Sequence, residues 1–439
     1  MNNKSDNKNI KINVVCTAIV KIVALVINLA MTPAYMDYFD NQESLGVWYT
    51  VLSMITWILA CDMGIGNGLR NKLTEAIAKR DKIMQKRYIS SAYIFMFGNA
   101  GGILLILIVM VRIVDWNRVL NIDDSIISNQ DLKKIIIILI ASIILQFVLR
   151  LITSICYALQ QSFLPGFFAL CTSVIMCIYV MASNKLGYFH NDLYALSWNY
   201  FIASNLPLFI ATVMVFGIKL KDVRPSINYF SREYAFDTLK LGGAFLWLQL
   251  MAFLLGNTDN YLVELLFGNA FVVEYQLYFK VFTLANAAIA MLMTPMWSAV
   301  TKAKSENNYE WLKKSYKITK IIGLIFIIGE LCIVPFTQII FNIWLGNNTI
   351  PAKMEISITF FVLGSLMIWS NVITNIVNGL GKLKLQVITV TIGALANIPL
   401  AIVFSKMFDS YTSIIYANII SYIPYIVLQT YALDKKILR

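Results

Sequence analysis

The sequence predicts an all-α integral membrane protein of about twelve transmembrane helices, arranged as two parallel six-helix bundles around a central cavity. Three observations support this fold class. The chain of 439 residues is 59% hydrophobic and only 14% charged, whereas soluble domains carry about 25% charged residues. Its apolar residues fall into stretches of about 20 residues or more, each long enough to cross a hydrocarbon core of about 30 Å. Basic residues gather in alternate loops between these stretches.

Twelve apolar stretches are predicted to cross the membrane as helices. They lie near residues 13–36, 44–66, 88–111, 133–158, 163–183, 193–218, 240–265, 272–298, 318–341, 356–379, 385–405 and 411–432. The predicted domains are cytoplasmic tails at 1–12 and 433–439, an N-terminal six-helix bundle at 13–218, a cytoplasmic linker at 219–239 and a C-terminal six-helix bundle at 240–432. Since each half has six spans, both halves have the same orientation, as in parallel repeats. The first apolar run is too long for the h-region of a cleavable signal peptide.

The lysines and arginines of the loops set the expected orientation. Basic residues concentrate in the loops that follow spans two, six and eight, such as Arg70, Lys219 and Lys302. Acidic residues such as Asp37 and Asp115 follow spans one and three instead. Because basic loops stay on the cytoplasmic side, both termini are expected to be cytoplasmic. The net charge of +12 therefore indicates topology, and we expect no nucleic-acid partner.

Several charged residues occur inside apolar spans. They are Lys21, Arg150, Asp259, Lys280 and Glu330, with Asp62 near the end of its span. A charge at a helix centre costs about 2.5–3.5 kcal/mol on insertion scales, so these residues are expected to face a cavity or one another. One interpretation is that the ion pairs Lys21–Asp62 and Asp259–Lys280 join neighbouring helices. The other is that the cations line a substrate cavity, while Asp62, Asp259 or Glu330 takes up a proton or a sodium ion.

Arg150 is the first candidate for substrate contact. Its own span supplies no obvious acidic partner, and its planar guanidinium matches the geometry of phosphate oxygens. Arg150 and Lys21 outnumber Asp62 in the cytoplasm-facing third of the first half, which gives that region a net positive charge. The pattern favours an anionic ligand that arrives from the cytoplasmic leaflet and meets Arg150 and Lys21. Lysine side chains also snorkel toward the interface, so Lys21 has a second interpretation.

The segment that follows Asp62 combines alternating glycines with a basic stretch. The glycines between residues 64 and 68 precede residues 69–84, whose apolar positions recur at helical spacing. We expect the glycines to form a flexible exit from the membrane. The following helix is then expected to lie on the inner leaflet, with its lysines toward anionic lipid.

Signatures of catalysis and of cofactor binding are missing from the sequence. It contains no Walker sequence G-x-x-x-x-G-K-[ST] for a nucleotide. The single histidine, His190, falls in a short outer loop, so no intramembrane histidine base is expected. The six cysteines lie inside predicted spans without a C-x-x-C pair, which argues against a disulfide framework and a zinc site. We therefore expect no enzyme activity, no catalytic residue, no metal and no cofactor.

One part of the chain resembles a known family. Leu45-Gly46-Val47-Trp48-Tyr49, Trp57-Ile58-Leu59 and Asp62-Met63-Gly64-Ile65-Gly66-Asn67-Gly68-Leu69-Arg70-Asn71 are similar to the N-terminal signature of O-antigen flippases of the Wzx type. Thr74-Glu75-Ala76, Tyr88-Ile89-Ser90-Ser91 and Asn257-Thr258-Asp259-Asn260 also fit this family. The resemblance covers the whole chain in architecture and is specific mainly across residues 45–91. Such proteins belong to the multidrug/oligosaccharidyl-lipid/polysaccharide exporter superfamily.

The resemblance implies a substrate and partners. The substrate would be a polyprenyl-pyrophosphate-linked oligosaccharide, such as an O-antigen repeat unit, flipped from the cytoplasmic to the outer leaflet of the bacterial inner membrane by alternating access. Arg150, Lys21 and Lys280 would line the cavity for its pyrophosphate or acidic sugars. The implied partners are the phospholipid bilayer, a polysaccharide polymerase and a chain-length regulator. Two alternatives stay open: a drug or cation antiporter of the same superfamily, and a non-transporting scaffold of a polysaccharide assembly complex.

Overall fold

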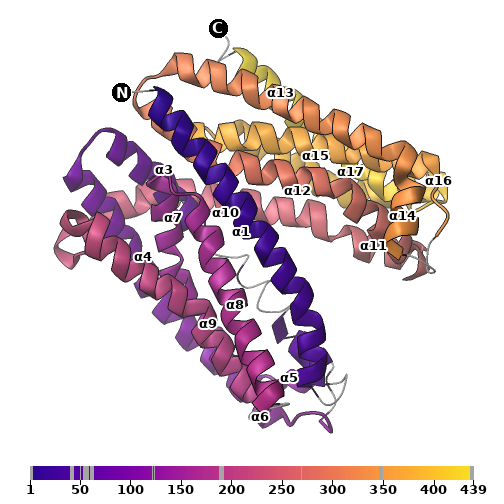
Figure 1. Cartoon of the computed structure of the whole chain (residues 1–439), viewed down its shortest axis with the longest axis horizontal. Coiled ribbons are helices and arrows are strands. Elements are labelled where there is room, and N and C mark those ends of the chain that lie inside the picture. The colour runs from indigo at the N-terminus through magenta and orange to yellow at the C-terminus, as the bar shows by residue number, and fades with distance from the viewer. Residues whose placement is uncertain are drawn as a thin grey trace. The chain divides into compact units, whose positions relative to one another are not determined.

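The chain is helical throughout the part that its structure describes. The computed structural model describes residues 3–39, 44–49, 51–52, 59, 64–120, 122, 124–186, 192–267, 269–345 and 350–435, and these ranges contain helices and no strand (Figure 1). Ten helical segments within them are long and apolar enough to cross a membrane. The predicted all-α membrane fold is confirmed.

The ten candidate spans correspond to the third to twelfth predicted spans. They cover Lys82–Ile113, Asn129–Ala158, Phe163–Lys185, Leu193–Lys219, Arg232–Phe267, Glu274–Ser305, Tyr309–Trp344, Met354–Leu380, Lys384–Phe408 and Thr412–Leu433. The first predicted span, 13–36, falls within helix α1 (Asn3–Tyr38), whose described apolar part is the shorter run Val15–Ala24. About half of the second predicted span, 44–66, lies outside the described residues.

The chain divides into two compact units, Met1–Gly243 and Ala244–Arg439. The first unit holds α1, α3 (Ile65–Ala78), α4 (Lys82–Ile113), α5 (Trp116–Leu120), α6 (Asn129–Leu149), α7 (Leu151–Ala158), α8 (Phe163–Leu186), α9 (Leu193–Met214) and the start of α10 (Arg232–Asn257). The second holds the rest of α10, α11 (Asp259–Phe267), α12 (Asn269–Ser305), α13 (Tyr309–Ile333), α14 (Thr337–Leu345), α15 (Met354–Leu380), α16 (Lys384–Phe408) and α17 (Thr412–Leu433).

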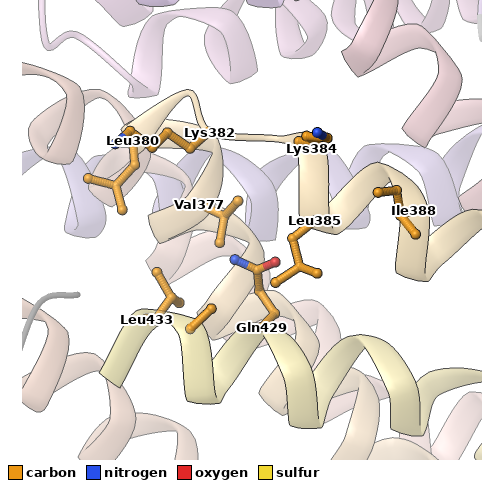
Figure 2. Close-up of a pocket in the computed structure, with 9 residues that line it drawn as sticks. Val377, Leu380, Lys382, Lys384, Leu385, Ile388, Gln429 and Leu433 are labelled. Carbon is orange, nitrogen blue, oxygen red and sulfur yellow. The ribbon is translucent and has the colours of Figure 1, made fainter. Parts of the chain in front are cut away.

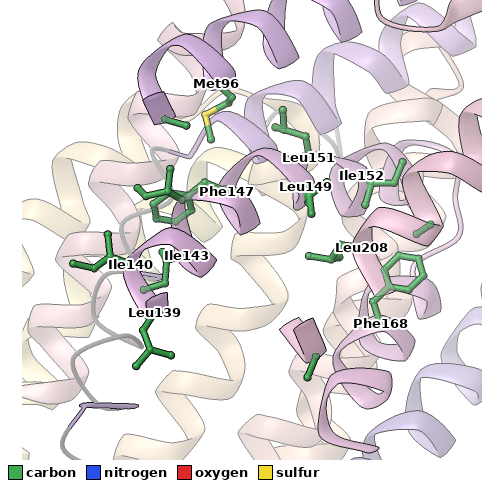
Figure 3. Packing of buried hydrophobic residues seen from close by; sticks show 14 of the residues in the cluster. Met96, Leu139, Ile140, Ile143, Phe147, Leu149, Leu151, Ile152, Phe168 and Leu208 are labelled. Carbon is green, nitrogen blue, oxygen red and sulfur yellow. The ribbon is translucent and has the colours of Figure 1, made fainter. Parts of the chain in front are cut away.

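Helix α6 forms the centre of the first unit. It packs against α4 and α9, while α1 packs on α8 and α3 on α7. Its nearly continuous apolar sequence is buried on several faces, as expected for a helix enclosed by others. Figure 3 shows Ile140, Ile143 and Phe147 of α6 in the same core as Met96 of α4.

Close contacts at glycine hold the second unit together. Helices α12 and α15, and α16 and α17, are its most extensive pairs. A Cβ added at Gly379 of α15 would come within 2.6 Å of the Trp297 carbonyl oxygen on α12, and one at Gly393 of α16 would overlap the Ser421 carbonyl on α17. Small residues of this kind let transmembrane helices approach closely, which compensates for the absence of a hydrophobic driving force in lipid.

The expectation of a surface-lying helix at residues 69–84 is wrong. Helix α3 ends at Ala78, and its apolar positions Leu69, Leu73 and Ala76 are fully buried in the first unit. Its glycines are contact points rather than a flexible exit: an added Cβ at Gly68 would overlap the Thr238 carbonyl of α10. A helical stripe of apolar residues indicates a covered face, and here protein covers it instead of lipid.

Candidate functional site

The first unit contains a buried arginine on helix α3. Arg70 is 3% exposed, and its guanidinium carbon lies 4.3 Å above the centre of the Tyr157 ring of α7. A guanidinium at this distance from an aromatic face is held by a cation–π interaction. Burial lowers the pKa of Arg70 to about 9 and the neighbouring Tyr157 opposes the shift, so the group still carries its charge at neutral pH. Close packing positions α3 here, because a Cβ at Gly66 would lie 2.6 Å from the Ser154 hydroxyl of α7.

Arg150, at the break between α6 and α7, also interacts with this tyrosine. Its backbone N–H donates to the Gln146 carbonyl at 2.7 Å, which ends α6, and its own carbonyl accepts from the Thr153 N–H at 2.9 Å and hydroxyl at 2.7 Å. The half-buried Arg150 side chain interacts electrostatically with Tyr157 and with Tyr200 of α9. Two guanidinium groups therefore share one tyrosine, and we call Arg70, Arg150, Tyr157 and Tyr200 the arginine–tyrosine cluster.

The sequence did not identify Arg70 as a site residue. It follows Leu69 and opens a basic loop, so the sequence alone explains it as a topology signal. Leu69 and Leu73 belong to the buried apolar stripe of α3. Arg70 lies next to Leu69 and three residues before Leu73, and this helical spacing places it beside the stripe. The sequence signal for Arg70 was therefore the helical periodicity of α3, which becomes informative once the protein is known to enclose this helix.

The two predicted lysines have exposed side chains. Lys21 lies on α1 in the first unit and Lys280 lies on α12 in the second. The suggested pair Lys21–Asp62 cannot be described, because Asp62 lies outside the described residues, as does His190. The assignment of Lys21 and Lys280 to a substrate cavity stays a prediction.

A buried polar chain in the second unit centres on Asp259. The span Arg232–Phe267 is interrupted at Thr258, and Asp259 opens α11 directly after the interruption. Its Oδ2 accepts hydrogen bonds from the Tyr275 hydroxyl at 2.7 Å and the Asn418 amide at 2.8 Å. Asn418 accepts in turn from the Asn397 amide at 2.7 Å. We call Asp259, Tyr275, Asn418 and Asn397 the aspartate chain.

The aspartate chain keeps unused acceptors. Asp259 is 3% exposed, yet Asp259 Oδ1 and Asn397 Oδ1 have no hydrogen-bond partner among the described residues. A buried acceptor without a partner is costly, so such oxygens are natural positions for a proton or a hard cation. Within the described ranges, the polar contacts of Asp259 are with Tyr275 and Asn418 and do not include the predicted ion pair with Lys280. Lys280 follows Tyr275 by five residues, and at about 100° per residue it projects from a different side of α12.

Glu330 is the second buried carboxylate of this unit. It lies on α13 with 1% exposure, against Gly364 of α15, where an added Cβ would overlap Glu330 Oε1. The Ser365 hydroxyl is nearby, but neither carboxylate oxygen has a hydrogen-bond partner within the described ranges. No group of three or more His, Cys, Asp or Glu side chains in these ranges is arranged to hold a metal ion.

Solved transporter structures share the fold of this chain. A MATE in the straight conformation matches with a TM-score of 0.74 and 15% identity, over 98% of this chain and 96% of that one. An outward-facing multidrug resistance MATE family transporter of the MOP superfamily matches with a TM-score of 0.71 and 15% identity, over 97% and 95%. The fold is that of a MATE transporter. No protein-family model and no curated protein matches the sequence.

A third solved structure adds a comparison of pocket charge. It is a MOP superfamily transporter from Pyrococcus furiosus, whose binding pocket is described as having reverse polarity, suggesting a different function. It matches with a TM-score of 0.74 and 15% identity, over 97% of this chain and 96% of that one. In the present chain, the first unit contains the arginine–tyrosine cluster and the second unit contains the buried carboxylates Asp259 and Glu330.

Proposed function

We propose that this chain is a flippase that moves a polyprenyl-pyrophosphate-linked oligosaccharide from the cytoplasmic to the outer leaflet of a bacterial inner membrane by alternating access. The arginine–tyrosine cluster carries the proposal. Two guanidinium groups that interact with one tyrosine are suited to a phosphate-bearing substrate, because guanidinium forms paired hydrogen bonds with phosphate oxygens. Tyrosine rings beside them provide apolar faces for sugar rings. The termini would be cytoplasmic, in line with the basic loops.

The sign of the pocket charge supports this choice of substrate within the MATE fold. For one structural neighbour, the reverse polarity of the binding pocket is described as suggesting a different function. The fold therefore admits different substrates, and the charge of the site selects among them. A cationic first unit favours an anionic lipid head group, while a drug cation would be repelled by Arg70 and Arg150.

The buried carboxylates of the second unit are proposed to couple transport to a proton or a sodium ion. Asp259 lies at a break in a membrane-spanning helix, and such breaks supply ion-binding groups in secondary transporters. Its free Oδ1 and that of Asn397 are oxygen acceptors of the type that hard cations prefer. Glu330 is a second candidate, and Asp62 is a third by its position in the sequence.

Arg150→Ala is expected to lower export at least tenfold. The substitution removes a hydrogen-bonded charge contact with phosphate, which contributes about 1.5–3 kcal/mol, while Arg150→Lys keeps the charge and should retain part of the activity. The measurement is surface polysaccharide in a deletion strain that expresses each variant at equal membrane level. Arg118→Ala, in the short helix α5, is the matched control and should behave as the wild type. Full activity of Arg150→Ala would remove Arg150 from the substrate path.

A drug or cation antiporter is the second candidate function. The observation that favours it is the pair of buried carboxylates, Asp259 and Glu330, which would attract cations. Resistance to cationic dyes on overexpression, without any effect on glycan display, would support the antiporter and contradict the flippase. A scaffold is the third reading. It requires that neutral substitutions of Lys21, Arg150 and Lys280 together leave export unchanged.

A further inference from the structure

A pocket in the second unit combines an apolar lining with lysines at its edge. It has a volume of about 390 Å³ and lies between the end of α15, the start of α16 and the end of α17. Its walls are Val377, Leu380, Leu385, Ile388, Ala432 and Leu433, with Gln429 among them. Lys382 and Lys384 border it, and Figure 2 shows Lys382 on the connection between α15 and α16 and Lys384 at the start of α16, across the pocket from α17.

The pocket opens at the basic end of the second unit. Lys304, in the last turn of α12, donates a hydrogen bond to the Leu380 carbonyl at 2.7 Å. Lys320 forms an ion pair with Asp434, which follows α17, at 3.1 Å. These lysines belong to the loop that predicts the cytoplasmic side, so the pocket lies at the corresponding membrane surface.

A buried amide inside the pocket lacks its hydrogen bond. Gln429 is 5% exposed, and its Oε1 has no partner in the described part of the chain. Figure 2 shows this amide directed into the space between Val377 and Leu385. A buried amide group without a partner costs about 1–3 kcal/mol, so a ligand with polar groups would satisfy it. Helix α16 begins beside it, and no side chain caps its first turn, which leaves the positive end of the helix dipole facing the same region.

We propose that this pocket binds an anionic phospholipid of the surrounding leaflet. The head-group phosphate lies between Lys382 and Lys384 at the N-terminus of α16, and an acyl chain lies along Leu385, Ile388 and Leu433. The Gln429 amide donates to the phosphate through its N–H and accepts from a head-group hydroxyl through its oxygen. Basic pockets between transmembrane helices are known sites for anionic head groups. Phosphatidylglycerol provides the charge and the hydroxyl, whereas phosphatidylcholine provides neither a net charge nor a hydroxyl.

The first unit provides a contrast. A pocket of about 260 Å³ is lined by Leu107, Met110, Val111, Trp116, Val119, Leu120 and Ile140. The only polar hydrogen among these side chains, Trp116 Nε1–H, already donates to the Val111 carbonyl at 3.2 Å. That pocket lacks groups that select a head group, so the proposal concerns the lysine-bordered pocket alone.

The test measures lipid retained by the purified full-length chain, in the absence of any oligosaccharide. Protein is transferred into nanodiscs of equal parts phosphatidylglycerol and phosphatidylcholine, extracted, and its bound lipid is counted by native mass spectrometry. We expect the wild type to retain phosphatidylglycerol preferentially. The variant Lys382→Ala/Lys384→Ala should lose this preference by roughly 25-fold, at about a fivefold effect for each lysine near a membrane surface.

Two further variants separate a built site from general surface charge. Lys314→Ala/Lys317→Ala removes two exposed lysines of α13 in the same basic region and should bind lipid as the wild type does. Ala432→Phe fills the pocket while keeping both lysines, and it should abolish retention without lowering the unfolding temperature. Equal retention of the two lipids by the wild type would overturn the proposal. Wild-type retention by Ala432→Phe, or an equal loss in the control pair, would overturn it as well.

Discussion

Gly68→Ala is expected to destabilise the first unit by about 3 kcal/mol, the upper end of overpacking effects. The new Cβ would overlap the Thr238 carbonyl oxygen and lie 3.0 Å from the Gly242 nitrogen, both on α10. Backbone atoms of a packed helix cannot rotate away as a side chain can, so α3 and α10 have to separate. The separation would also shift Arg70, which lies two residues further along α3.

The measurement for Gly68 is thermal unfolding of the purified protein in detergent, together with its level in the membrane. Gly98→Ala provides the control, because Gly98 lies within helix α4 and no atom lies within 4 Å of its added Cβ. That change should be neutral or stabilising, since alanine favours the helix by up to about 1 kcal/mol. If both variants unfold at the same temperature, the close approach of α3 and α10 is not important for stability.

Asp259→Asn is expected to reduce transport at least tenfold while leaving the fold intact. Asparagine has nearly the same shape and keeps an acceptor for the Tyr275 hydroxyl. It cannot bind a proton, and it lacks the charge that holds a cation. Hydrogen bonds to a charged group contribute about 1.5–3 kcal/mol, which corresponds to a factor of about ten to one hundred. The readout is export in the deletion strain, with the unfolding temperature measured in parallel.

Controls for Asp259 come from the same unit. Asp409→Asn changes an exposed aspartate that has a φ of 38°, a backbone conformation that asparagine tolerates, and it should leave transport unchanged. Tyr275→Phe removes one hydrogen bond and keeps the carboxylate, so a partial loss is expected. Wild-type export by Asp259→Asn would exclude this carboxylate from coupling and leave Glu330 as the candidate in this unit.

The length of the apolar stretches was enough to predict most of the fold. Ten predicted spans match described helices, because crossing a bilayer requires about 20 apolar residues whatever their order. The helix interruptions at Arg150 and Thr258 could not be predicted in this way. A polar residue inside an apolar stretch also occurs in uninterrupted helices, so it does not mark a break. The character of α3 was also hidden, because helical periodicity marks a covered face without identifying what covers it.

Part of the candidate site could also be predicted from the sequence. Arg150, Asp259 and Glu330 are conspicuous as charges inside apolar runs. Their partners are not, because Tyr275 and Asn418 are ordinary residues that only the tertiary structure brings to Asp259. Arg70 was missed because a basic loop explains any arginine in it. The predicted domain boundaries and the roles of Lys21, Lys280 and Asp62 stay predictions.

The most direct test of the central claim is flipping of lipid-linked oligosaccharide by the purified chain. Proteoliposomes are prepared with a polyprenyl-pyrophosphate-linked oligosaccharide in both leaflets, and an added glycosidase removes sugar from the outer leaflet only. We expect the wild type to expose the protected inner pool gradually, and Arg150→Ala to expose it at least tenfold more slowly. Persistent protection of that pool by a folded wild-type protein, with a proton and a sodium gradient each applied, would contradict the account.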